Sequence, residues 1–126
     1  MASLKILIAE DELLIAKVMR LQFEKQGFRV ENVTDANEAF EIALTMLPDI
    51  IILDILLKNK TTGLEAGRRI REAGILSPII FTTGNSYDQT IELIHNISHA
   101  VVLTKPVEFE KLLEIINKFS ADGRVE

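Results

Sequence analysis

The chain has 126 residues, of which 48% are apolar and 26% charged, with a net charge of −5 and no cysteine. This length suits one domain with one core, which we place over residues 1–126 with the core at 4–119. The composition argues against a disordered chain, a disulfide framework and a membrane protein, since no apolar run approaches ~20 residues.

Two further expectations come from charge and from the N-terminus. A negative chain without a basic stripe is not expected to bind nucleic acid directly. The first residues lack the charged and apolar regions of a signal peptide, so we expect a cytoplasmic protein.

Apolar runs alternate with helical patterns along the chain. The runs are rich in Ile, Val and Leu, which is typical of strands buried on both faces of a parallel sheet. In chain order we expect strand 4–9, helix 13–26, strand 29–33, helix 36–46, strand 50–53, helix 63–73, strand 78–81, helix 88–94, strand 100–103 and helix 108–119. This order predicts an α/β fold with right-handed crossovers and helices on both faces. Residues 120–126 read as a polar tail or the start of a linker.

Local signals support the helix ends. Asp35 and Asp88 can each cap the helix that follows. Gly27 and Gly74 are expected just past the ends of helices, and Pro48 closes the second one.

Polar side chains follow four of the apolar runs. They are Glu10-Asp11-Glu12, Asp54, Thr82-Thr83-Gly84 and Lys105-Pro106. The carboxyl ends of parallel strands meet at one edge of a sheet, where open α/β folds bind their ligands. Acids, a hydroxyl group and a lysine at that edge suit a divalent metal and a phosphoryl group.

These residues also carry a resemblance to a known family. Glu10-Asp11, Asp54, Thr83 and Lys105-Pro106, each at the end of its own strand, resemble the receiver (CheY-like) domain of two-component response regulators over residues 4–119. The resemblance implies a flavodoxin-like (βα)5, doubly wound, five-stranded parallel sheet with strand order 2-1-3-4-5.

The family implies a function in signal transduction by phosphorelay. Such a domain accepts a phosphoryl group from a sensor histidine kinase or phosphotransfer protein, then switches conformation to control an output domain or effector. It catalyses its own aspartyl phosphorylation and dephosphorylation but is not a conventional enzyme. It acts as a monomer or as a phosphorylation-dependent dimer.

The resemblance assigns the phosphoacceptor and the metal ligands. Asp54 would be the nucleophile, a role that a carboxylate can fill. Close carboxylates repel unless a cation lies among them, and Mg²⁺ prefers oxygen ligands. Mg²⁺, or Mn²⁺ as a substitute, would bind Asp11 and Asp54 directly, Glu10 through water, and the backbone carbonyl of Leu56.

The resemblance also assigns the phosphoryl-binding groups. Thr83 would hydrogen-bond a phosphoryl oxygen, with Thr82 as a competitor for that role, and Gly84 would leave room for the group. Lys105 would pair with the acyl phosphate. Pro106 suggests a cis Lys105–Pro106 bond, because cis peptides nearly always precede proline.

The loop after Asp54 departs from the usual family pattern. Lys58 stands where proline is common, Gly63 comes one position later than usual, and Thr62 replaces an aspartate. This loop carries no predicted catalytic group.

Another departure concerns the switch. Many receivers carry an aromatic residue three positions before the lysine, where this chain has Val102. We therefore expect the switch to act through Thr83 and the following loop, where Tyr87 is the single tyrosine of the chain. The alternative is that Tyr87 only packs on the fourth helix.

The first helix has apolar residues on more than one side. Ile15, Val18, Met19 and Phe23 have helical spacing and are expected to face the core. Leu14 and Leu21 lie off that stripe and are candidates for docking the partner kinase, although scattered surface leucines are also common.

Two other functions compete with the receiver. A flavodoxin-like flavin carrier would need a phosphate-binding loop after the first strand, where this chain has three acids. An aspartate-based phosphatase would have its nucleophile at the end of the first strand, not the third. His95 and His99 have no partner at metal-ligand spacing and are expected to lie at the surface.

Overall fold

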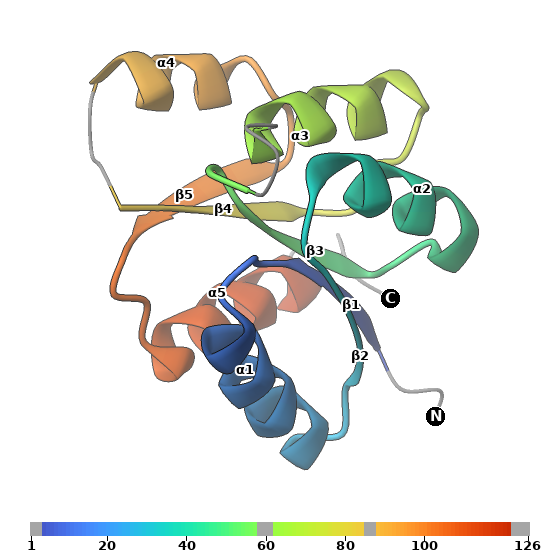
Figure 1. Ribbon diagram of the computed structural model, residues 1–126, viewed down its shortest axis with the longest axis vertical. Helices are drawn as coiled ribbons and strands as arrows, with labels where there is room; N and C mark the ends of the chain where they lie inside the picture. Colours follow the sequence, from blue (N-terminus) through green and yellow to red (C-terminus); the bar gives the residue numbers. More distant parts are fainter. Residues whose placement is uncertain (1–3, 58–61, 85–87, 122–126) are drawn as a thin grey trace.

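The computed structural model describes residues 4–57, 62–84 and 88–121 as one α/β sandwich (Figure 1). In chain order its elements are β1 (Lys5–Ala9), α1 (Leu13–Lys25), β2 (Arg29–Val33), α2 (Ala36–Met46), β3 (Ile50–Asp54), α3 (Gly63–Glu72), β4 (Ile79–Thr83), α4 (Asp88–His95), β5 (Ala100–Thr104) and α5 (Phe109–Ala121). None of the helices in these ranges is both long and apolar enough to cross a bilayer.

The strands form a single parallel sheet in the order β2-β1-β3-β4-β5. This confirms the predicted fold class and strand order. The strand ends differ slightly from the prediction, because β3 includes Asp54 and β4 continues through Thr82 and Thr83. In this register Asp54 lies opposite Thr82 on the neighbouring strand.

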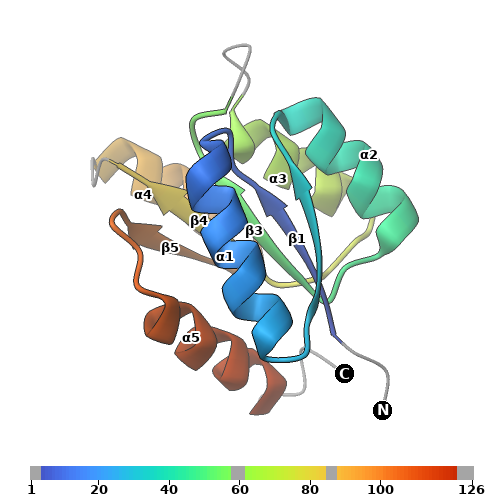
Figure 2. The same ribbon diagram turned by 60° about the horizontal axis from the view of Figure 1, so that its bottom comes forward.

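The helices cover both faces of the sheet (Figure 2). Helices α1 and α5 bury one face, while α2, α3 and α4 bury the other. Because side chains alternate along a strand, each central strand supplies both cores. On β4, for example, Ile80 belongs to the α1/α5 core and Phe81 to the opposite core.

The helix boundaries follow from local chemistry. The Asp35 carboxylate accepts a hydrogen bond from the Glu38 backbone N–H over 2.8 Å and caps α2 as predicted. Thr62, the departure from the family pattern, caps α3 by accepting from the Glu65 N–H over 3.1 Å. Its hydroxyl therefore supplies the cap that an aspartate would otherwise give.

The predicted core stripe of α1 is partly wrong. Ile15 and Val18 are 39% and 48% exposed, and the fully buried residues of this helix are Ala16 and Phe23, with Met19 partly buried. The buried side of α1 therefore runs through Ala16, Met19 and Phe23, which helical spacing puts on one face. Ile15 and Val18 consequently point towards the surface.

Candidate functional site

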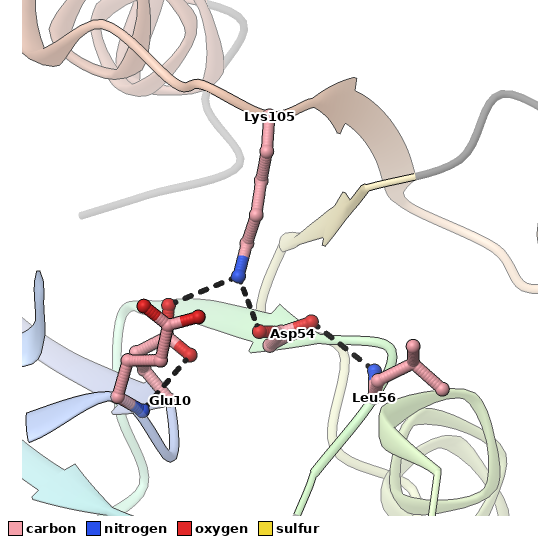
Figure 3. A network of polar contacts seen from close by, with 5 residues as sticks. Glu10, Asp54, Leu56 and Lys105 are labelled. Carbon is pink, nitrogen blue, oxygen red and sulfur yellow. Dashed lines mark hydrogen bonds and ion pairs between the residues drawn. The ribbon is translucent and has the colours of Figure 1, made fainter.

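The carboxyl ends of β1, β3 and β5 bring three charged side chains together (Figure 3). Lys105 Nζ donates a hydrogen bond to Asp54 Oδ2 over 2.6 Å and another to Glu10 Oε1 over 3.2 Å. Both carboxylates are buried, and the Lys105 side chain is 26% exposed. The lysine is therefore the countercharge for two acids that have little contact with water.

The electrostatics of this cluster favour a proton or a cation near Glu10. Burial and, after it, the neighbouring Asp54 raise the pKa of Glu10 to about 7, although Lys105 acts in the opposite direction. For Lys105, burial alone would lower the pKa, but the contacts with Asp54 and Glu10 outweigh burial, so the net pKa is raised. Lys105 thus stays charged at neutral pH.

Asp11 completes an acidic cluster. One carboxylate oxygen each from Glu10, Asp11 and Asp54 lie within 4.8 Å of one another. Asp11 is partly exposed, so an ion can reach the cluster from solvent. Three hard oxygen ligands that still leave room for water suit Mg²⁺, which usually takes one or two carboxylates and keeps several waters.

The segment after β3 is held close to Asp54. The Leu56 N–H donates to Asp54 Oδ1 over 3.1 Å, and Leu56 forms an isolated antiparallel bridge with Thr62. Next to this bridge, the Gly63 N–H donates a hydrogen bond to the Ile55 carbonyl over 2.8 Å. That bond does not use the carbonyl of Leu56, which is the one predicted to bind the metal.

Glycine is required where α3 begins. A Cβ added to Gly63 would lie 2.1 Å from the backbone carbonyl oxygen of Asp54, closer than any real contact. Gly63 comes one position later than in the usual family pattern, but it still provides the missing side chain that lets α3 start directly against the end of β3.

Two threonines end β4 on opposite sides of the sheet. Thr82 and Thr83 are both buried. By strand alternation Thr82 shares the face of Ile80, and Thr83 shares that of Phe81. Gly84 is exposed, and an added Cβ there would meet no described atom within 4 Å.

The remaining predicted residues are placed as follows. The Lys105–Pro106 peptide bond is cis, as predicted. Val102 is partly buried and packs on the α2/α3/α4 core. His95 and His99 are exposed, and Tyr87 lies outside the described residues.

An apolar groove opens beside the charged cluster, and sequence reasoning missed it. Its volume is about 620 Å³, and it lies between α1 and the segment that follows β5. The groove is lined by Glu10, Leu14, Ile15, Val18, Met19, Gln22, Thr82, Lys105, Pro106 and Val107. The sequence signal for it was the wide apolar surface of α1. Of the two docking candidates named from that signal, Leu14 lines the groove and Leu21 does not.

Sequence comparison gives one family and several curated relatives. The family model described as Response regulator receiver domain matches residues 6–117. The chain is 36% identical over 112 residues to the transcriptional regulatory protein DltR of Streptococcus agalactiae, covering 87% of this chain and 49% of the relative. It is 32% identical over 91 residues to the alkaline phosphatase synthesis transcriptional regulatory protein PhoP of Bacillus subtilis, covering 71% of this chain and 38% of the relative. The chain thus spans about half or less of these curated relatives.

Solved structures with the same fold agree. A CheY-like response regulator receiver domain from Methanospirillum hungatei has a TM-score of 0.88 at 24% identity, covering 97% of this chain and 96% of that one. A response regulator receiver domain from Francisella has a TM-score of 0.85 at 24% identity, covering 96% and 99%. At these identities the structures establish the fold alone.

Proposed function

Because this chain belongs to the response regulator receiver domains of two-component signalling systems, we propose that Asp54 is its phosphoacceptor. The observation that carries the proposal is the contact between the buried Asp54 carboxylate and Lys105. A lysine that already binds a carboxylate oxygen there can also bind the phosphoryl group formed on it.

The proposed step is a phosphoryl transfer between two side chains. A carboxylate oxygen of Asp54 attacks the phosphorus of a phosphohistidine, the P–N bond breaks, and the imidazole leaves with its electron pair. The product is an acyl phosphate. Little covalent assistance is needed, so the surrounding residues act by positioning and by neutralising charge.

Mg²⁺ would supply positive charge between the carboxylates and the phosphoryl oxygens. Asp11 and Asp54 would be direct ligands, Glu10 would bind through water, and the Leu56 carbonyl would complete the protein ligands. The acidic cluster supports this assignment, and Mn²⁺ has the same ligand preference.

Lys105 and Thr83 would hold the phosphoryl group. Lys105 would keep one contact to Asp54 and turn its other N–H donors to phosphoryl oxygens once a divalent cation takes its place beside Glu10. Thr83 would donate a hydrogen bond from the hydroxyl, with Gly84 leaving space. The burial of Thr83 at the end of β4 supports this role.

The groove beside the cluster would receive the phosphoryl donor. Leu14 is 75% exposed and lines the groove together with Lys105, whereas Leu21, which is 56% exposed, is not part of the groove lining. A histidine kinase or phosphotransfer protein whose histidine lies on an apolar helix would match this surface.

The acyl phosphate would shift an equilibrium between two conformations. Thr83 and the loop after it, with Tyr87, would carry the change, because Val102 is too stiff and small to swing between two sites. With beryllofluoride and Mg²⁺, amide NMR signals of Gly84 to Asp88 should then shift more than those of Val101 to Leu103. Comparable shifts around Val102 would assign the switch to β5.

The wider cellular role is also a proposal. The relatives named above are transcriptional regulators nearly twice as long as this chain. By analogy, a cytoplasmic protein with this domain would couple a sensor histidine kinase to an output domain or effector, as a monomer or a phosphorylation-dependent dimer. The domain itself would bind neither nucleic acid nor membrane. It would catalyse its own phosphorylation and dephosphorylation without acting as a conventional enzyme.

Labelling by a small phosphoryl donor tests the proposal. Acetyl phosphate should add one phosphoryl group to the wild-type protein only when Mg²⁺ or Mn²⁺ is present, as measured by intact mass. Asp54→Asn should abolish the added mass, and Asp11→Ala should weaken both metal binding and labelling. Labelling that persists in the Asp54→Asn protein would refute the assignment.

A further inference from the structure

The groove between α1 and the segment after β5 is apolar at its sides and charged at one end. Its apolar lining comes mainly from α1, together with Pro106 and Val107, and Lys105 and Glu10 line it too. Lys105 and Glu10 also belong to the cluster around Asp54. A partner that fills the groove therefore lies directly beside the phosphoacceptor.

Two uncharged polar residues, Gln22 on α1 and Thr82 on β4, also line this groove. Thr82 is only 5% exposed, lies opposite Asp54 in the sheet and shares the face covered by α1 and α5. No hydrogen bond among the described residues involves its hydroxyl group. Thr82 is thus more than nine-tenths buried as a residue, yet its hydroxyl oxygen is not among the described buried polar atoms that lack a partner, so water can reach it through the groove.

The fold alone does not account for a threonine at this position. Valine has the same shape and a comparable preference for strands. The strand residue beneath on the same face is Ile80, which is fully buried in an apolar core. The Thr82 hydroxyl has no hydrogen bond with the described residues and is free to bond water, so a partner that covers the groove must replace that water or leave the hydroxyl unpaired.

We propose that Thr82 determines which phosphoryl donor this domain accepts. This inference rests on the proposed function and makes its partner more specific. The donor must place a hydrogen-bonding side chain against the Thr82 hydroxyl, next to its phosphohistidine, while the part of its surface that contacts α1 is mainly apolar. A donor that is apolar at this point would bury the hydroxyl unpaired and bind less well.

Isosteric variants test the proposal in the intact chain. Thr82→Val removes the hydroxyl at nearly constant shape, Thr82→Ser keeps it, and Thr45→Val removes an exposed hydroxyl on α2 as a matched control. The two phosphoryl donors are acetyl phosphate and an autophosphorylated histidine kinase. Among the histidine kinases of the same genome, the one that labels the wild-type protein fastest is used. Initial rates give kcat/KM for the kinase and a rate constant for acetyl phosphate.

We expect Thr82→Val to lower kcat/KM with the kinase by about fivefold or more, mainly through KM. Labelling by acetyl phosphate should change by less than about twofold, and Thr82→Ser and Thr45→Val should resemble the wild type with both donors. Circular dichroism melting would verify that each variant folds.

Three results would overturn the proposal. The first is transfer from the kinase to Thr82→Val at the wild-type rate or faster. The second is an equal loss of phosphorylation rate in Thr82→Val with both donors. The third is labelling of the wild type by acetyl phosphate but by no kinase. An equal loss would place Thr82 at the acyl phosphate itself. Failure of acetyl phosphate to label wild-type Asp54 would instead refute the proposed function.

Discussion

Replacing Lys105 by methionine should destabilise the metal-free protein and leave the magnesium-bound protein much less affected. The substitution keeps an apolar stem of similar length but removes the charge that contacts Asp54 at 2.6 Å and Glu10 at 3.2 Å. Two buried carboxylates would then face each other without a countercharge.

The size of the effect follows from burial and from proton uptake. Breaking a fully buried ion pair costs about 3–5 kcal/mol of unfolding free energy. The Lys105 side chain is 26% exposed, and Glu10 can take up a proton, so we expect about 2 kcal/mol at pH 8. This would lower Tm by about 8 °C for a chain of this size.

The loss should depend on pH in a defined direction. Glu10 has a pKa of about 7 in the folded protein against an ordinary 4.5, so the folded state retains a proton that the unfolded chain has released. The unfolding free energy of the protein therefore falls as pH rises from about 4.5 towards 7. Without Lys105 the folded pKa of Glu10 rises further, so the difference from the wild type should be larger at pH 8 than at pH 6.

Urea unfolding followed by circular dichroism measures these differences. The wild type and Lys105→Met would each be unfolded in EDTA and in Mg²⁺ at about 100 times its Kd. At that concentration, bound Mg²⁺ should raise the unfolding free energy by about 2.7 kcal/mol. Lys111→Met is the matched control, because its contact with Glu114 is exposed and long at 3.9 Å, and it should change stability by less than about 0.5 kcal/mol. Equal stability of Lys105→Met and wild type in EDTA at pH 8 would refute the reasoning.

Three further predictions concern the site and its surroundings. Gly63→Ala should lower the unfolding free energy by about 2 kcal/mol or more in urea, because its Cβ would lie 2.1 Å from the Asp54 carbonyl oxygen; wild-type stability would show that α3 moves away freely. Mg²⁺ affinity, measured by calorimetry, should increase as pH rises through about 7 because Glu10 becomes ionised, and Glu10→Gln should flatten this dependence. An unchanged slope in Glu10→Gln would mean that another group titrates. Leu14→Glu should slow transfer from a histidine kinase while sparing labelling by acetyl phosphate, whereas equal loss of both would indicate a damaged fold.

The positions of the main site residues follow from sequence pattern. Asp54 and Lys105 each come directly after an apolar run, and parallel strands bring such positions to one edge of the sheet. The direct contact between Lys105 and Glu10 does not follow from spacing, because it depends on how far each side chain reaches across the strand ends. Sequence reasoning assigned these two residues to different ligands.

The surface of α1 shows a second limit of periodicity. Ile15, Val18 and Phe23 share helical spacing, yet only Phe23 is fully buried, and the other fully buried residue of the helix is Ala16. An alanine is a weak signal in any apolar pattern. The groove and the placement of Thr82 in its lining depend on this packing, so pattern alone could not predict them.

The central claim is that Asp54 receives the phosphoryl group, and reductive trapping tests it most directly. Borohydride reduces an acyl phosphate on aspartate to the alcohol of homoserine and releases phosphate. The protein would be treated with acetyl phosphate and Mg²⁺, reduced, digested and sequenced by tandem mass spectrometry. We predict homoserine at position 54 and an unmodified aspartate at position 11. Homoserine at position 11, or at neither position in protein that carries the added phosphoryl mass, would contradict the account.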